Sequence, residues 1–282
     1  MNMKLILTAA ALCVVGASAN FSEVCVMLSY DERGSGLPVV LIHGFPLCRK
    51  MWRPQAAPLA AAGYRVICPD LPGFGDSPLP AGQASMARYA DAVIGLLDDL
   101  EIEQAVVGGM SMGGYVLLNL VERYPGRVLG ALYLLTRAAA DDAAGKEKRT
   151  LLAAEVRGGN RVIVPETFAG VLFATGTPEQ QPQLVAEVRQ WMEATPADGV
   201  AGGLLAMRDR DDYLGKLAGL TVPSLVVGAE RDRAIPPEHA RALAGGLPDA
   251  ELIIIPGAGH MANLEQPQPF NRALLDFLAK FA

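Results

Sequence analysis

The chain has 282 residues, of which 51% are hydrophobic and 19% charged, and its formal net charge is −6. This composition excludes an intrinsically disordered protein, and the length suits one α/β domain with a substantial buried core. We find no basic cluster, so the composition also argues against a nucleic-acid partner.

The N-terminus predicts a secretory signal peptide. One lysine precedes an apolar stretch from Leu5 to Val15, and Ala17-Ser18-Ala19 offers a small-residue cleavage site. Cleavage would remove residues 1–19 and leave 20–282 as a periplasmic or secreted domain without a membrane span. The alternative is a buried N-terminal element in a cytoplasmic protein, because the apolar stretch is too short to cross a bilayer comfortably.

The cysteines do not organise this fold. Cys13 would leave with the signal peptide, and Cys25, Cys48 and Cys68 would remain. An odd number of thiols cannot all pair within one chain, and their spacing suits no zinc site. We expect neither a metal nor a cofactor.

Six short apolar runs rich in Val, Ile and Leu follow one another along the chain. Such runs are typical of strands buried on both faces of a parallel sheet. They cover residues 37–44, 64–70, 104–110, 129–136, 223–230 and 250–257.

Helical patterns separate several of these runs. Apolar residues spaced by three and four predict one helix over about 86–100 and another that begins near Phe270. The alternation predicts an α/β fold with a mostly parallel central sheet flanked by helices. Residues from about 138 to 212 contain no strand-like run, so we predict a helical cap inserted over the carboxyl edge of the sheet, where ligands of such sheets bind.

Ser111 stands in Gly109-Met110-Ser111-Met112-Gly113, after a predicted strand and before a predicted helix. That context is the one required for a nucleophile elbow. A structural turn is one alternative. A phosphate-binding loop is another, since Gly108 and Gly113 have its glycine spacing, but Gly114 and Tyr115 stand where Lys and Ser or Thr are required.

A serine hydroxyl needs a base, and the base needs an acid to hold it. His260 follows the last predicted strand, so it returns to the same edge as Ser111. Between them, the loop after the strand at 223–230 offers Glu230 and Asp232, of which we favour Asp232. His239 is predicted to lie solvated on a surface helix.

These motifs resemble those of the α/β-hydrolase superfamily over about 26–282, closest to small esterase, enol-lactonase and non-haem haloperoxidase-like members. The matching segments are "HGFP" (43–46), "DLPGFGDS" (70–77), "GMSMGG" (109–114), "GAERDRAIPPE" (228–238) and "GAGHMANLEQP" (257–267).

The resemblance implies a Ser111–His260–Asp232 triad and an oxyanion hole formed by the backbone N–H groups of Phe45 and Met112. It also implies a structural role for His43 and for the turn at 70–77. Two features depart from the family pattern: Cys48 stands where relatives often carry an acidic residue, and the acid loop has one residue more than the common G-x-x-D spacing.

We therefore expect a serine hydrolase that cleaves carboxylic esters or lactones of small, partly apolar substrates. Alternatives are a 3-oxoadipate enol-lactonase-like activity, a haloperoxidase or perhydrolase-like activity, and a non-catalytic ligand-binding protein. Arg137, at the end of the last strand before the cap, would meet either a substrate carboxylate or solvent. The sequence does not indicate an oligomeric state.

Overall fold

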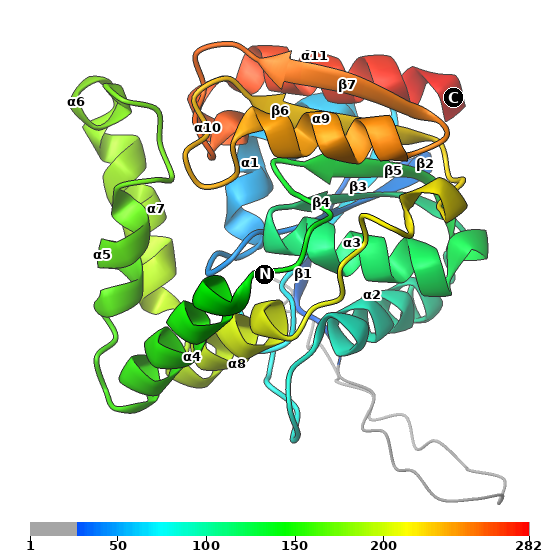
Figure 1. The fold of residues 1–282 in the computed structure, drawn as a ribbon. Coiled ribbons are helices and arrows are strands. Elements are labelled where there is room, and N and C mark those ends of the chain that lie inside the picture. Colours follow the sequence, from blue (N-terminus) through cyan, green and yellow to red (C-terminus); the bar gives the residue numbers. More distant parts are fainter. Residues whose placement is uncertain (1–26, 282) are drawn as a thin grey trace, which may run out of the picture.

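The computed structural model describes residues 27–281, so the predicted signal peptide, Cys13 and Cys25 lie outside the described residues. A seven-stranded sheet forms the centre, in the order β1-β3-β2-β4-β5-β6-β7 (Figure 1). β1 is antiparallel to β3, and the other neighbours are parallel. The strands are β1 Tyr30–Arg33, β2 Leu37–Ile42, β3 Tyr64–Pro69, β4 Ala105–Met110, β5 Val128–Leu134, β6 Ser224–Ala229 and β7 Ala250–Ile255.

The predicted mostly parallel α/β sheet is confirmed, and each of the six apolar runs overlaps one of the strands β2 to β7. β1 was not predicted, because Tyr30-Asp31-Glu32-Arg33 has no apolar run and all four residues are exposed. An edge strand of this kind is held by its ladder to β3 and buries no apolar face, so it gives no hydrophobic signal.

Helices cover both faces of the sheet (Figure 1). Because successive side chains of a strand point to opposite faces, β2 sends Val40 and Ile42 to one cluster of buried residues and Val39 and Leu41 to the other. α2 (Met86–Asp99), α3 (Met112–Arg123) and α9 (Pro237–Gly246) pack on the first face, and α1 (Arg53–Ala61) and α11 (Pro267–Leu278) on the second. The remaining short elements are α10 (Ala262–Glu265) and 3₁₀ helices at Arg49–Trp52, Pro125–Arg127, Leu217–Gly219 and Ala279–Phe281.

The chain between β5 and β6 contains helices and no strand in the described structure. We call residues 138–212 the helical segment. α4 and α8 lie side by side, while α5, α6 and α7 form a separate arm beside the sheet (Figure 1). The helices are α4 Ala143–Arg157, α5 Ile163–Ala169, α6 Thr177–Gln180, α7 Pro182–Ala194 and α8 Ala197–Arg208. Among the described helices, none combines the length and apolarity needed to cross a membrane.

A buried carboxylate ties the two ends of the helical segment together. Asp141, near the beginning, accepts a hydrogen bond of 3.0 Å from Arg210, near the end, and further hydrogen bonds from Arg137 and Arg149. Burial alone would raise the pKa of Asp141, but the hydrogen bonds from Arg210 and Arg149 hold that pKa well below its usual range. The carboxylate is therefore a central anchor of the segment.

We predict that Asp141→Asn lowers the free energy of unfolding by about 3 kcal/mol, because it leaves partly buried guanidinium groups without their anion. Urea denaturation at neutral pH measures this. Asp209→Asn is the matched control, since Asp209 is 45% exposed in its ion pair with Arg208, and such a pair contributes about 1 kcal/mol or less.

The effect should depend on pH with a known sign. Because the pKa of Asp141 is lower in the folded state, its ionised carboxylate stabilises the folded protein. This stabilisation is complete at pH values above the unfolded-state pKa of Asp, about 3.9, and is lost as the pH falls from there through the folded-state pKa. The difference between wild type and Asp141→Asn should therefore shrink in acid. Equal destabilisation by the two variants at neutral pH would contradict the anchoring role.

Candidate active site

Ser111 occupies a strained turn between β4 and α3. Its backbone has φ 54° and ψ −114°, a conformation that side-chain-bearing residues rarely adopt. The turn is held from both sides: the Ser111 N–H donates to Leu134 O at 2.9 Å, and Thr136 Oγ1 donates to Ser111 O at 2.8 Å. The half-buried serine is thereby fixed at the carboxyl edge of the sheet.

The glycines around Ser111 are required by close backbone contacts. A Cβ on Gly109 would lie 2.1 Å from Gly113 O, and one on Gly113 would lie 2.5 Å from Ile42 O. A Cβ on Gly114 would lie 2.4 Å from the Thr136 hydroxyl. The G-x-S-x-G pattern therefore has a steric origin here: strand and helix approach too closely for any side chain.

The loop after β2 lies against this turn. A Cβ on Gly44 would be 3.4 Å from Met110 O and 3.5 Å from Ser111 Cβ. His43 Nε2 accepts from the Leu71 N–H at 2.9 Å, and its Nδ1 lies 2.9 Å from Gly44 O. Burial lowers the pKa of His43, so the neutral ring links the loop to the turn at 70–77.

The turn at 70–77 supports the same loop through a second contact. Asp70 is fully buried and accepts from the Arg49 N–H at 2.7 Å and the Asp76 N–H at 2.9 Å, besides pairing with the Arg49 guanidinium. Neighbouring Cys48 is also buried, and burial raises the pKa of its thiol. A thiol in this state is a weak nucleophile, which favours packing over reactivity.

Phe45 and Met112 flank Ser111 with free main-chain donors. Met112 is the first residue of α3, where a helix has no internal acceptor for the N–H. Within the described chain, no hydrogen bond uses the N–H of Phe45 or of Met112. Both N–H groups are thus free to donate a hydrogen bond to an oxygen atom of a ligand.

His260 and Asp232 are brought together by the loops that follow β7 and β6. His260 Nδ1 lies 2.7 Å from Asp232 Oδ2, and both side chains are buried. Asp232 Oδ1 accepts the N–H groups of Ala234 and Ile235 at 2.9 and 2.8 Å. Because a carboxylate only accepts hydrogen bonds, the imidazole donates from Nδ1 and leaves Nε2 to act as an acceptor.

Glu230 occupies a different position from Asp232. It is exposed, and its Oε2 accepts from the Gly257 N–H at 2.7 Å. Ser111 lies at the same edge as the His260–Asp232 pair, but the hydrogen bonds of the described chain do not include one between Ser111 Oγ and His260. Catalytic hydrogen bonds are often long in enzymes without ligand.

The helical segment is hydrogen-bonded to the loops that carry Pro46, Asp232 and His260. Thr195 Oγ1 donates to Pro46 O at 2.8 Å, and Arg233 donates to Phe173 O at 3.2 Å. The Met261 N–H, next to His260, donates to Leu172 O at 3.0 Å. The segment therefore lies directly against the edge that carries the candidate site.

Glu265 joins the helical segment to the histidine loop, a role that no local sequence pattern indicates. This buried carboxylate accepts the Gly259 N–H at 2.9 Å through Oε1. Its Oε2 accepts the Ala174 N–H at 2.9 Å and the Thr177 hydroxyl at 2.7 Å. Glu265 stands within the quoted "GAGHMANLEQP" segment, but its burial shows only in the fold.

His239 differs from its prediction. It lies on α9 as expected, but it is half-buried, and burial followed by the nearby charge of Arg137 lowers its pKa. The fully solvated position predicted from the sequence is therefore wrong, because the side chain is partly enclosed and lies near Arg137.

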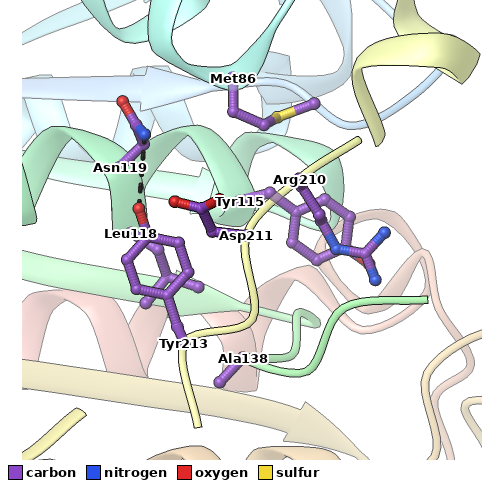
Figure 2. Close-up of a pocket in the computed structure, with 8 residues that line it drawn as sticks. All are labelled: Met86, Tyr115, Leu118, Asn119, Ala138, Arg210, Asp211 and Tyr213. Carbon is purple, nitrogen blue, oxygen red and sulfur yellow. Dashed lines mark hydrogen bonds between the residues drawn. The ribbon is translucent and has the colours of Figure 1, made fainter. Parts of the chain in front are cut away.

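A small depression lies at the junction of α2, α3 and the end of the helical segment (Figure 2). Its free volume is about 10 Å³, enough for about one water molecule. The Arg210 guanidinium lies 4.2 Å from the centre of the Tyr115 ring there, and Tyr213 is hydrogen-bonded to Asn119. The depression is too small for an organic substrate, and the contacts of its lining residues hold the end of the helical segment on α3. Within the described chain, no three His, Cys, Asp or Glu side chains are grouped to hold a metal ion.

A family model described as the alpha/beta hydrolase fold matches residues 38–267. The chain belongs to the α/β-hydrolase family. The resemblance drawn from the motifs is therefore confirmed, and we describe the chain below as an α/β hydrolase.

Three solved structures of α/β hydrolases are similar to this one. An esterase from Thermogutta terrifontis is 37% identical with a TM-score of 0.87, over 90% of this chain and 93% of that one. An enol-lactonase from Burkholderia xenovorans is 27% identical with a TM-score of 0.83, over 89% and 96%. A bromoperoxidase from Bacillus anthracis is 25% identical with a TM-score of 0.80, over 89% and 95%.

We predict that Glu265→Gln lowers the free energy of unfolding of this α/β hydrolase by about 2 kcal/mol. The amide replaces one accepting oxygen with an NH₂ group, which then faces N–H or O–H donors in a buried site. Urea denaturation measures the change. Glu230→Gln alters an exposed acceptor on the neighbouring loop, so its free energy of unfolding should stay within about 0.5 kcal/mol of wild type. Equal effects of the two variants would contradict the proposed role of Glu265 in joining the helical segment to the histidine loop.

Proposed function

We propose that this α/β hydrolase is a serine hydrolase that cleaves carboxylic esters or lactones of small, partly apolar substrates. The observation that carries the proposal is the 2.7 Å hydrogen bond between His260 and Asp232, at the sheet edge where Ser111 stands in its strained turn. A base oriented by a buried acid, at the same sheet edge as a serine hydroxyl, is the arrangement that nucleophilic catalysis requires.

In this mechanism, Ser111 Oγ attacks the substrate carbonyl while His260 Nε2 takes the hydroxyl proton. Asp232 keeps the proton on Nδ1 and stabilises the imidazolium that forms. The imidazolium then gives its proton to the leaving alcohol as the acyl-enzyme forms. Water attacks the acyl-enzyme by the same proton transfers and releases the acid.

The N–H groups of Phe45 and Met112 would receive the negative charge that develops on the carbonyl oxygen. They are proposed for this role because they flank Ser111 and have no other acceptor in the described chain. Fixed donors aimed at an oxyanion contribute a few kcal/mol each to transition-state stabilisation.

The helical segment would act as a lid over this site. Its hydrogen bonds to Pro46 and to the loops of Asp232 and His260 support that role. Half-buried Phe168, on α5, contacts the Phe45 ring at a centroid distance of 5.9 Å. An aromatic side chain in this place suits a substrate with an apolar part.

Lactone hydrolysis would use the same groups, with the leaving alcohol retained in the product. Perhydrolysis would differ only in that hydrogen peroxide replaces water in the second half of the reaction. Hydrolysis of open esters, hydrolysis of lactones and perhydrolysis with added hydrogen peroxide should therefore be assayed side by side. A binding protein without activity would hydrolyse none of them.

We predict that wild type hydrolyses short-chain nitrophenyl esters and that kcat falls as the pH decreases from about 8 to 5, because a protonated imidazole cannot accept the serine proton. Asp232→Asn should lower kcat by about 10³-fold or more, since the acid that holds the histidine tautomer is lost. Steady-state kinetics across this pH range measure both effects.

Glu230→Gln is the matched control. The side chain is exposed and its hydrogen bond ends on backbone, so kcat should stay within about threefold of wild type. A large loss in Glu230→Gln with little loss in Asp232→Asn would assign the acid to Glu230 instead. A rate that does not change with pH would contradict a histidine base.

A further inference from the structure

Arg137 stands one residue beyond the contact that fixes Ser111. Thr136 donates its hydroxyl to Ser111 O, and the Leu134 carbonyl receives the Ser111 N–H. The end of β5 and the chain just beyond it are therefore hydrogen-bonded to Ser111, and the next side chain is the guanidinium of Arg137. Arg137 is 23% exposed, so it is neither a freely solvated rim charge nor fully enclosed.

The charges around Arg137 do not balance. Asp141 is the single carboxylate paired with Arg137, Arg149 and Arg210. Three guanidinium groups, which stay protonated at any physiological pH, share one negative charge. The cluster therefore carries a net charge of about +2 in a chain whose formal net charge is −6.

The three arginines are not equally engaged. Arg210 donates to Met207 O at 2.7 Å and to Ala139 O at 2.9 Å, stacks on Tyr115 (Figure 2), and is only 3% exposed. Arg149 donates to Asp141 and lies 3.4 Å from the Met207 sulfur. These two belong to the packing of α4 and α8.

Arg137 makes one hydrogen bond, from Nη2 to Asp141, and its buried Nε–H has no partner in the described chain. A buried donor left without an acceptor is destabilising, the more so on a charged group. Arg210 Nε is also unpartnered, but the closed packing around Arg210 leaves a ligand no access. Of the three arginines, Arg137 is the most exposed, at 23% against 17% for Arg149 and 3% for Arg210, and it makes the fewest hydrogen bonds.

The groups that face Arg137 lie on three elements. The helical segment supplies Asp141, Arg149 and Arg210, and α9 supplies His239, whose pKa the charge of Arg137 helps to lower. Asp232 acts on the same histidine from the acid loop. Arg137 therefore lies between the helical segment and His239 on α9.

We propose that Arg137 binds a free carboxylate of the substrate, so that the preferred substrates are esters or lactones carrying a second, unesterified carboxyl group. This inference rests on the proposed function, because it names the substrate class of that site. A carboxylate at the exposed part of the guanidinium would accept a hydrogen bond from it and offset part of the excess positive charge. Guanidinium–carboxylate pairs of this kind are directional and stronger than neutral hydrogen bonds.

The test uses two pairs of esters that differ in one group. Monoethyl succinate is compared with ethyl 4-methylpentanoate, and acetoxyacetate with isobutyl acetate, so that a carboxylate replaces an isopropyl group on the acid or on the alcohol side. Wild type should favour the carboxylate member of at least one pair in kcat/KM. Arg137→Gln should reduce that preference by about tenfold or more, chiefly through KM.

Arg149→Gln is the matched control, since it removes an arginine from the same aspartate. It should leave the preference for the carboxylate ester within about twofold of wild type. The proposal is overturned if wild type disfavours the carboxylate in both pairs, or if Arg149→Gln changes the preference as much as Arg137→Gln does.

Calorimetric titration of succinate separates this inference from the proposed function. Wild type should bind succinate, and Arg137→Gln should bind it about tenfold more weakly or not at all. Succinate binding that depends on Arg137, in a protein that hydrolyses no ester, would retain the carboxylate site and reject the hydrolase. Ester hydrolysis with no effect of Arg137→Gln on either measurement would retain the hydrolase and reject the carboxylate site.

Discussion

The backbone conformation of Ser111 is the constraint on which the candidate site depends. A φ of 54° in a residue with a side chain costs about 1–3 kcal/mol and persists only where the surroundings impose it. Here they do so by contact: Gly113 lies against β2 and Gly114 against Thr136. The Ser111 N–H is bonded to the last residue of β5, and its carbonyl to Thr136 just beyond. The contact between Ser111 and Thr136 also fixes the position of the backbone from which the Arg137 side chain extends.

The other side chains of the site are held by backbone rather than by one another. Besides its hydrogen bond with His260, Asp232 accepts two N–H groups of its own loop. The His260 loop is held by hydrogen bonds to Glu265 and to Leu172 O. Because Leu172 and the donors Ala174 and Thr177 belong to the helical segment, a displacement of that segment would loosen the histidine loop. Access to the site and the orientation of the base are thereby linked.

The strands and the positions of the motifs could be predicted from the sequence because both follow local rules. Strands buried on two faces read as apolar runs, and the glycines around Ser111 mark a turn with no room for side chains. What escaped prediction depends on distant partners. β1 is polar and defined only by its pairing to β3. Glu265 is identified only by donors far along the chain, and the partial burial of His239 shows only in the fold.

The most direct test of the account is whether Ser111 is an activated nucleophile. Intact mass is measured after wild type and Ser111→Ala are exposed to a fluorophosphonate, which reacts with serines that a neighbouring base activates. The account predicts a single covalent adduct on wild type and none on folded Ser111→Ala. An unmodified wild type, or an adduct of equal yield on the variant, would contradict it.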